Sequence, residues 1–416
     1  MRRGDVMLLP PTLEIFVLWH PDDVAGQVVA DALLDHFHGT AFSGLVGGAV
    51  EVYTRSGAWD GHQGPPRPLP FVAQLPNGLA TAAVTVVVPV MGVNLARALQ
   101  DDPEWLRYFE DMVNARRENP NVALFGLVVD QAATAPDGHL SRLLGPEQTL
   151  DRAGANNSQV LTRDLCHSIT GFVDGDGDRR LRVFISHTKR YTPAEQPDRV
   201  SELVGRVRHI IGETHMSAFF DEADLQPGVQ WETELTSAAE SSALLVVRTD
   251  LYASREWCQR EVLAAKQADM PVVVLQALHQ GEERGSFLMD HVPSVAIQSA
   301  DDADHVRTSI EEALTKLVDE ALKRALWRRQ RSRLSSYGFD WLPANAPEPT
   351  TLAHWLRSVE KQPTPEDKLF VLHPDPPLCS PEISAINDLL AVGMIEGALE
   401  ILTPRTFANR GGQVQR

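Results

Sequence analysis

Two stretches of this 416-residue chain repeat one order of sequence patterns, and this repeat constrains the fold more than any other feature. In each stretch, short apolar segments alternate with longer segments whose apolar residues recur at helical spacing. The first stretch shows this order at 13–20 (LEIFVLWH), 24–37, 49–54 (AVEVYT), 83–91 (AVTVVVPVM), 102–116 and 121–129. The second stretch shows it at 181–188 (LRVFISHT), 200–211, 217–225, 243–249 (ALLVVRT), 254–267 and 271–277.

Apolar strands that alternate with amphipathic helices predict parallel βαβ units, because a parallel sheet is covered by helices on both faces. We therefore predict an α/β protein with two flavodoxin-like parallel-sheet domains and a small C-terminal α/β segment. The expected ranges are 10–150 for the first domain, 151–178 for a linker, 179–335 for the second domain and 336–416 for the C-terminal segment. Ligands of such domains bind at the carboxyl ends of the strands.

The C-terminal segment shows a strand–helix–strand pattern after a Pro-rich linker. Two interpretations stay open for it. It is either part of a nucleotide-sensing module or a plain α/β oligomerisation module, because no phosphate-binding glycine motif is present to decide between them.

Charge and composition exclude several classes of protein. A formal net charge of −18 argues against nonspecific nucleic-acid binding, which depends on Lys and Arg. The sequence has no apolar run of membrane-spanning length and no secretory signal, so we expect no membrane association and a cytoplasmic location. Cys166, Cys258 and Cys379 lack CxxC spacing, and we therefore expect no disulfide framework, zinc site or other metal.

Three motifs stand in order in the second repeat: Phe-Ile-Ser at the end of 181–188, FFDEADLQPGVQW at 219–231, and SREWCQRE at 254–261. Together they resemble the bacterial Toll/interleukin-1 receptor (TIR) domain over roughly residues 180–330. TIR domains are either signalling scaffolds or enzymes that cleave the nicotinamide–ribose bond of NAD. In the enzymes the glutamate of a W-x-x-x-E turn is catalytic, and this pattern falls on Trp257 and Glu261.

The resemblance therefore implies that Glu261 is the catalytic residue. Cleaving the bond to a cationic nicotinamide needs no general acid, but it builds positive charge on the ribose, which a fixed carboxylate can stabilise. The alternative for Glu261 is the usual one for glutamate, a solvated position on a helix surface.

The resemblance also implies roles for residues around Glu261. The residues expected to contact the substrate are Ser186, His187, Lys189, Asp221, Leu225 and Trp257. Those expected to shape the loop or support the site are Gly228, Trp231 and Cys258. Gln226 stands where some relatives carry a second acidic residue, which argues against a mechanism with two carboxylates. Cys258 has no histidine near it in the sequence and is not expected to be a nucleophile.

The first repeat departs from these motifs. Four residues after Trp105 stands Phe109, and Glu110 is rotated by about 100° to another side of the helix. We therefore expect a degenerate, noncatalytic TIR-like domain here, with a role in assembly or regulation.

The prediction for the whole chain is an NAD+ glycohydrolase that forms nicotinamide and ADP-ribose. NAD+ is its substrate, and no cofactor is expected. The resemblance implies a bacterial antiphage effector, activated when TIR domains assemble into a homo-oligomer, with a nucleotide or a protein as a possible activator. Two alternatives stay open: a noncatalytic TIR scaffold, and a TIR cyclase that produces a cyclic ADP-ribose isomer.

Overall fold

The computed structural model describes residues 11–39, 42, 50–58, 64–71, 81–144, 149–151, 158–175, 181–189, 192, 197–219, 238–282, 284–289, 291–297, 302–359, 368–392 and 399–412. Among the helices of these ranges none is a candidate for a membrane span, and the longest one carries charged residues throughout.

The first domain contains a parallel sheet with the strand order β2-β1-β3-β5-β6, and β4 also pairs with β3. Its strands are β1 (Leu13–Leu18), β2 (Val50–Arg55), β3 (Val84–Met91), β4 (Val122–Leu124), β5 (Gly126–Val128) and β6 (Thr149–Asp151). Its helices are α1 (Val24–His38), α2 (Val93–Asp101), α3 (Pro103–Glu118), the 3-10 turn η2 (Gln131–Thr134) and α4 (His139–Leu143). All eight residues of β3 are buried, as expected for a central strand covered on both faces.

The second domain repeats this topology, with the strand order β11-β10-β9-β7-β8 and only parallel pairs. The strands are β7 (Arg182–His187), β8 (Ser217–Phe219), β9 (Ala243–Arg248), β10 (Val272–Gln276) and β11 (Ser294–Ala296). The helices are α6 (Pro197–Gly212), η5 (Tyr252–Ser254), α8 (Glu256–Gln267), η6 (Phe287–Met289) and α9 (Ala303–Leu334). In both sheets the first strand lies between the second and the third, which is the flavodoxin-like order. The predicted fold class is confirmed.

The segment expected to be a linker contains a long helix, α5 (Ser158–Asp174). Its buried residues Leu161, Leu165, Ile169 and Val173 recur every four positions, so one apolar stripe runs along the helix. The neighbouring polar stretch 152–157 dominated the sequence pattern and hid this period. The stripe belongs to the core, and α5 packs against both α1 and α9.

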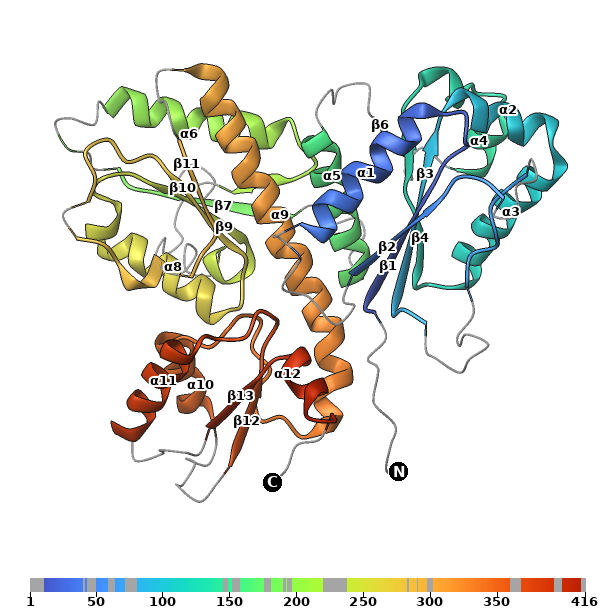
Figure 1. Ribbon diagram of the computed structural model, residues 1–416. Coiled ribbons are helices and arrows are strands. Elements are labelled where there is room, and N and C mark those ends of the chain that lie inside the picture. The colour runs from blue at the N-terminus through green and yellow to red at the C-terminus, as the bar shows by residue number, and fades with distance from the viewer. Residues whose placement is uncertain are drawn as a thin grey trace, which may run out of the picture.

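Helices α1, α5 and α9 lie between the two sheets and form a layer that both domains share (Figure 1). One continuous apolar cluster runs through this layer from β1 and β3 to β7, β9 and β10. Because side chains alternate along a strand, Val183 and Ile185 of β7 face this shared layer. Phe184 and Ser186 face the opposite side, which α8 covers.

The C-terminal segment contains two parallel strands, β12 (Leu369–Leu372) and β13 (Leu399–Leu402), connected through α11 (Ser380–Val392). It also contains η7 (Ser335–Tyr337), α10 (Pro349–Ser358) and α12 (Pro404–Asn409). Trp327, near the end of α9, packs with Leu372, Leu402 and Phe407, so this segment is built onto the end of α9. A cavity of about 520 Å³ lies between α8, α9 and this segment.

Candidate active site

Helix α8 presents a carboxylate on its inner face. Cys258, Val262 and Ala265 recur at helical spacing and are buried against the sheet, and Glu261 belongs to the same buried face with 7% exposure. Glu256 in the first turn complements the helix dipole, and it forms an exposed ion pair with Arg260. A solvated position for Glu261 is therefore wrong, because its side chain points inward.

A chain of hydrogen bonds holds the Glu261 carboxylate. Ser186, next to last in β7, donates its single hydroxyl proton to Glu261 Oε2. The Tyr252 hydroxyl lies 2.5 Å from the same Ser186 oxygen, so Tyr252 must be the donor in that bond. Burial, followed by the nearby Cys258 thiol and Glu261 carboxylate, raises the pKa of Tyr252 well above its ordinary value. Tyr252 thus keeps its proton and continues to donate.

The residues beside Ser186 and Glu261 occupy distinct environments. His187, the last residue of β7, is half-buried, and its carbonyl oxygen lies 3.9 Å from the Cys258 sulfur. Cys258 thus lies against the end of β7. Trp257 is partly buried and packs against the apolar cluster between α8 and the sheet. The Arg260 guanidinium lies over its ring, 5.5 Å from the ring centre. Lys189 is exposed just beyond the strand.

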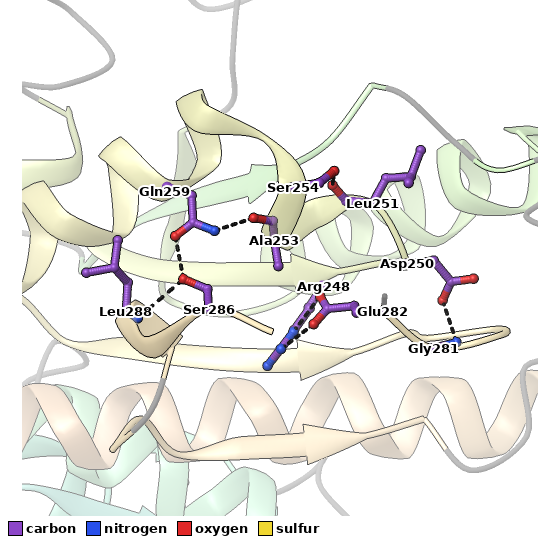
Figure 2. A network of polar contacts seen from close by, with 10 residues as sticks. All are labelled: Arg248, Asp250, Leu251, Ala253, Ser254, Gln259, Gly281, Glu282, Ser286 and Leu288. Atoms are coloured by element: carbon purple, nitrogen blue, oxygen red, sulfur yellow. Dashed lines mark hydrogen bonds and ion pairs between the residues drawn. The ribbon is translucent and has the colours of Figure 1, made fainter. Parts of the chain in front are cut away.

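A polar network fixes the loops around α8 (Figure 2). Arg248 at the end of β9 makes two contacts with Glu282, one of them 2.8 Å long. The Asp250 carboxylate accepts backbone hydrogen bonds from residues 279, 280 and 281 at 2.8–3.2 Å. Gln259 donates to the Ala253 carbonyl oxygen and accepts a 2.5 Å bond from Ser286. The Gln259 bonds tie α8 to the turns before and after it. The Arg248 and Asp250 bonds tie the end of β9 to the 279–282 loop.

The structure brings five predicted residues together at the carboxyl end of β7: Ser186, His187, Trp257, Cys258 and Glu261. The predicted loop residues Asp221, Leu225, Gly228 and Trp231, with Gln226, lie outside the described residues.

The sequence patterns did not reveal Tyr252. It precedes the S-x-x-W motif in a segment that resembles an ordinary turn, and only the contact with Ser186 shows its place in the site.

The corresponding helix of the first domain has no inward carboxylate. Trp105 and Phe109 of α3 are buried, with 3% and 0% exposure, and Glu110 is exposed. The expected rotation of Glu110 away from the inner face is therefore confirmed. The position that matches Glu261 is filled by an aromatic ring of the core, which has no acid–base chemistry.

Residues 183–315 match the family model of the TIR domain. This range begins in β7 and ends within α9, so it contains Ser186, Tyr252 and Glu261. The second domain is a TIR domain. Among solved structures, this chain is similar to a chain of one described as the structure of the activated Roq1 resistosome directly recognizing the pathogen effector XopQ (TIR domains). The identity is 23% over 33% of this chain and 83% of that chain, with a TM-score of 0.20. A search of curated proteins finds no match.

Proposed function

We propose that the TIR domain cleaves the nicotinamide–ribose bond of NAD+ with Glu261 as the catalytic residue. The observation that carries this proposal is the position of the Glu261 carboxylate. It is buried on the inner face of α8 and accepts a hydrogen bond from Ser186 near the end of β7. The carboxyl ends of parallel strands are where α/β domains bind ligands.

The chemistry suits a single carboxylate. Nicotinamide leaves as a neutral base from a cationic substrate, so no proton has to be supplied to it. Positive charge develops on the ribose in the transition state, and a fixed anion in a site that excludes water stabilises that charge. Ser186 and Tyr252 are positioning residues, because they orient the carboxylate through hydrogen bonds.

The same proposal includes the biological role. The protein acts as a bacterial antiphage effector in the cytoplasm, depletes NAD+ and becomes active when TIR domains assemble into a homo-oligomer. The TIR motifs support this proposal, and the first domain, which has a buried Phe109 in place of the carboxylate, contributes regulation or assembly. Residues 10–150, 179–335 and 336–416 are the proposed units, with α5 as the helical connection.

The test is NAD+ turnover by the purified full-length chain at high protein concentration with a crowding agent, with products separated by chromatography. We expect nicotinamide and ADP-ribose from the parent chain and a loss of at least about 100-fold in Glu261→Gln, which keeps the side-chain shape but removes the charge. Glu256→Gln is the matched control on the same helix, because Glu256 is exposed and should be replaceable.

The outcomes separate the alternatives. A cyclic product that depends on Glu261 identifies a cyclase. Turnover that is equal in the parent and in Glu261→Gln refutes the role of Glu261. No turnover in any chain under assembling conditions supports a noncatalytic scaffold instead.

A further inference from the structure

Three side chains of metal-ligand type meet in the helical layer that the two domains share. His36 comes from α1, Cys166 from α5 and Asp319 from α9. The His36 Nε2 atom lies 2.9 Å from Asp319 Oδ1 and 3.8 Å from the Cys166 sulfur. All three ligand atoms lie within 4.8 Å of one another, and no other such group of three occurs in the described part of the chain.

The group is enclosed by the core. Cys166 has no exposed surface, the Asp319 side chain is 5% exposed and the His36 side chain 17%. The rings of Phe37 and Phe42 pack around the imidazole. A carboxylate in such a place needs a compensating charge or strong hydrogen bonds, because burial of an isolated charge is costly. The contacts described for the Asp319 carboxylate are those with the His36 imidazole and the Cys166 thiol.

A catalytic role for this thiol does not fit the geometry. In a thiol–imidazole–carboxylate relay the two nitrogens of the ring contact different partners, whereas here the same Nε2 faces both Cys166 and Asp319. Cys166 is also fully buried, so a substrate could not reach its sulfur.

The ligand types and distances fit a tetrahedral zinc ion. Zinc binds Cys sulfur at about 2.3 Å and His nitrogen or carboxylate oxygen at about 2.0–2.2 Å, which places ligand atoms about 3.3–3.8 Å apart. The His36–Cys166 distance of 3.8 Å already meets this condition. The His36–Asp319 distance of 2.9 Å has to widen by about half an ångström, which a change of side-chain rotation can provide.

We propose that His36, Cys166 and Asp319 bind one zinc ion, which joins the first domain to the last helix of the TIR domain. The fourth position takes a water molecule from the side on which His36 is partly exposed. The three ligands come from three separate helices, so the site exists only when the domains are docked. Zinc binding therefore stabilises the docked arrangement. The proposal does not depend on NAD+ cleavage.

The experiment measures metal in the full-length chain, purified without chelator and with any affinity tag removed. We expect one zinc per chain by elemental analysis, and a thiolate-to-metal charge-transfer band after replacement with Co²⁺. The zinc content per chain should fall at least tenfold in Cys166→Ser and in Asp319→Asn. It should stay unchanged in Cys379→Ser, a change at an exposed cysteine. Chelator should lower the Tm of the parent chain by several degrees and leave that of Asp319→Asn unchanged.

Two results overturn the proposal. One is a folded parent chain, by circular dichroism, that binds neither zinc nor cobalt at micromolar metal. The other is metal that persists in both Cys166→Ser and Asp319→Asn, which would place it elsewhere. If Cys166→Ser fails to fold, the nearly isosteric Asp319→Asn and the cobalt spectrum of the parent still decide between these results.

Discussion

Replacing Glu320 with alanine tests how α9 holds the TIR domain and the C-terminal segment together. Glu320 and Arg324 form an ion pair at 2.6 Å, with side chains only 11% and 7% exposed. Arg324 also donates to the Asp269 carbonyl oxygen at 3.0 Å and to Asn345 Oδ1 at 3.1 Å. The guanidinium therefore joins α9 to the turn after α8 and to the chain that leads into the C-terminal segment.

The magnitude follows from what remains after the change. Glu320→Ala leaves the buried guanidinium without its anion, and breaking a buried pair in this way costs about 3–5 kcal/mol of unfolding free energy. At about 2–4 °C per kcal/mol for a domain of this size, the Tm should fall by about 10 °C. Removing the cation too, in Glu320→Ala/Arg324→Met, should recover more than half of the loss, because the buried guanidinium is then gone. Only the more exposed Lys323 ammonium, which also contacts Glu320, loses its partner.

Scanning calorimetry of the full-length chain measures the effect. The control is Glu312→Ala on the same helix, where an exposed pair with Lys316 contributes no more than about 1 kcal/mol. Burial acts to raise the pKa of Glu320, but Arg324 and Lys323 outweigh it and lower the pKa overall. The stabilisation is thus complete above about pH 4.5 and is lost as the pH falls through the lowered pKa. A Glu320→Ala chain that loses no more than Glu312→Ala would refute this reasoning.

Three further predictions concern other parts of the chain. Burial lowers the pKa of His373 to about 4, so the unfolded state binds more protons between about pH 6.5 and pH 4. The C-terminal segment should lose about 3 kcal/mol of stability as the pH falls through that window, and urea titrations at several pH values should show this dependence vanish in His373→Gln. If the unfolding free energy of that variant falls with pH as steeply as that of the parent chain, another group is responsible. Leu165→Ala on α5 should cost about 2–5 kcal/mol by opening a cavity in the shared layer, and an unchanged calorimetric Tm would show that α5 contributes no packing. Asp250→Asn should speed hydrogen exchange of the backbone amides at 279–281 by about tenfold or more, because the charged acceptor is lost. Equal protection in both chains would mean that the loop is held by other contacts.

Much of the architecture could be predicted because its signals are local. The apolar strands at 83–91 and 243–249 are buried on both faces, and this alone specifies central parallel strands. The spacing of Trp257 and Glu261 is likewise local, and it places Glu261 on the inner face of α8 because a helix turns by a fixed angle per residue. Helix α5 was missed although its period is regular, since a polar stretch next to it carried the stronger pattern.

The repeated order of strands and helices determined the fold class, and the three motifs determined which half could carry a site. Both are properties of residues close together in the chain. Tertiary structure alone decided that Tyr252 supports Ser186, and that His36, Cys166 and Asp319 meet at one point. These contacts join residues on separate strands and helices, and their distances depend on how whole elements pack. No local pattern encodes that packing, because it results from the burial of apolar surface summed over the entire core.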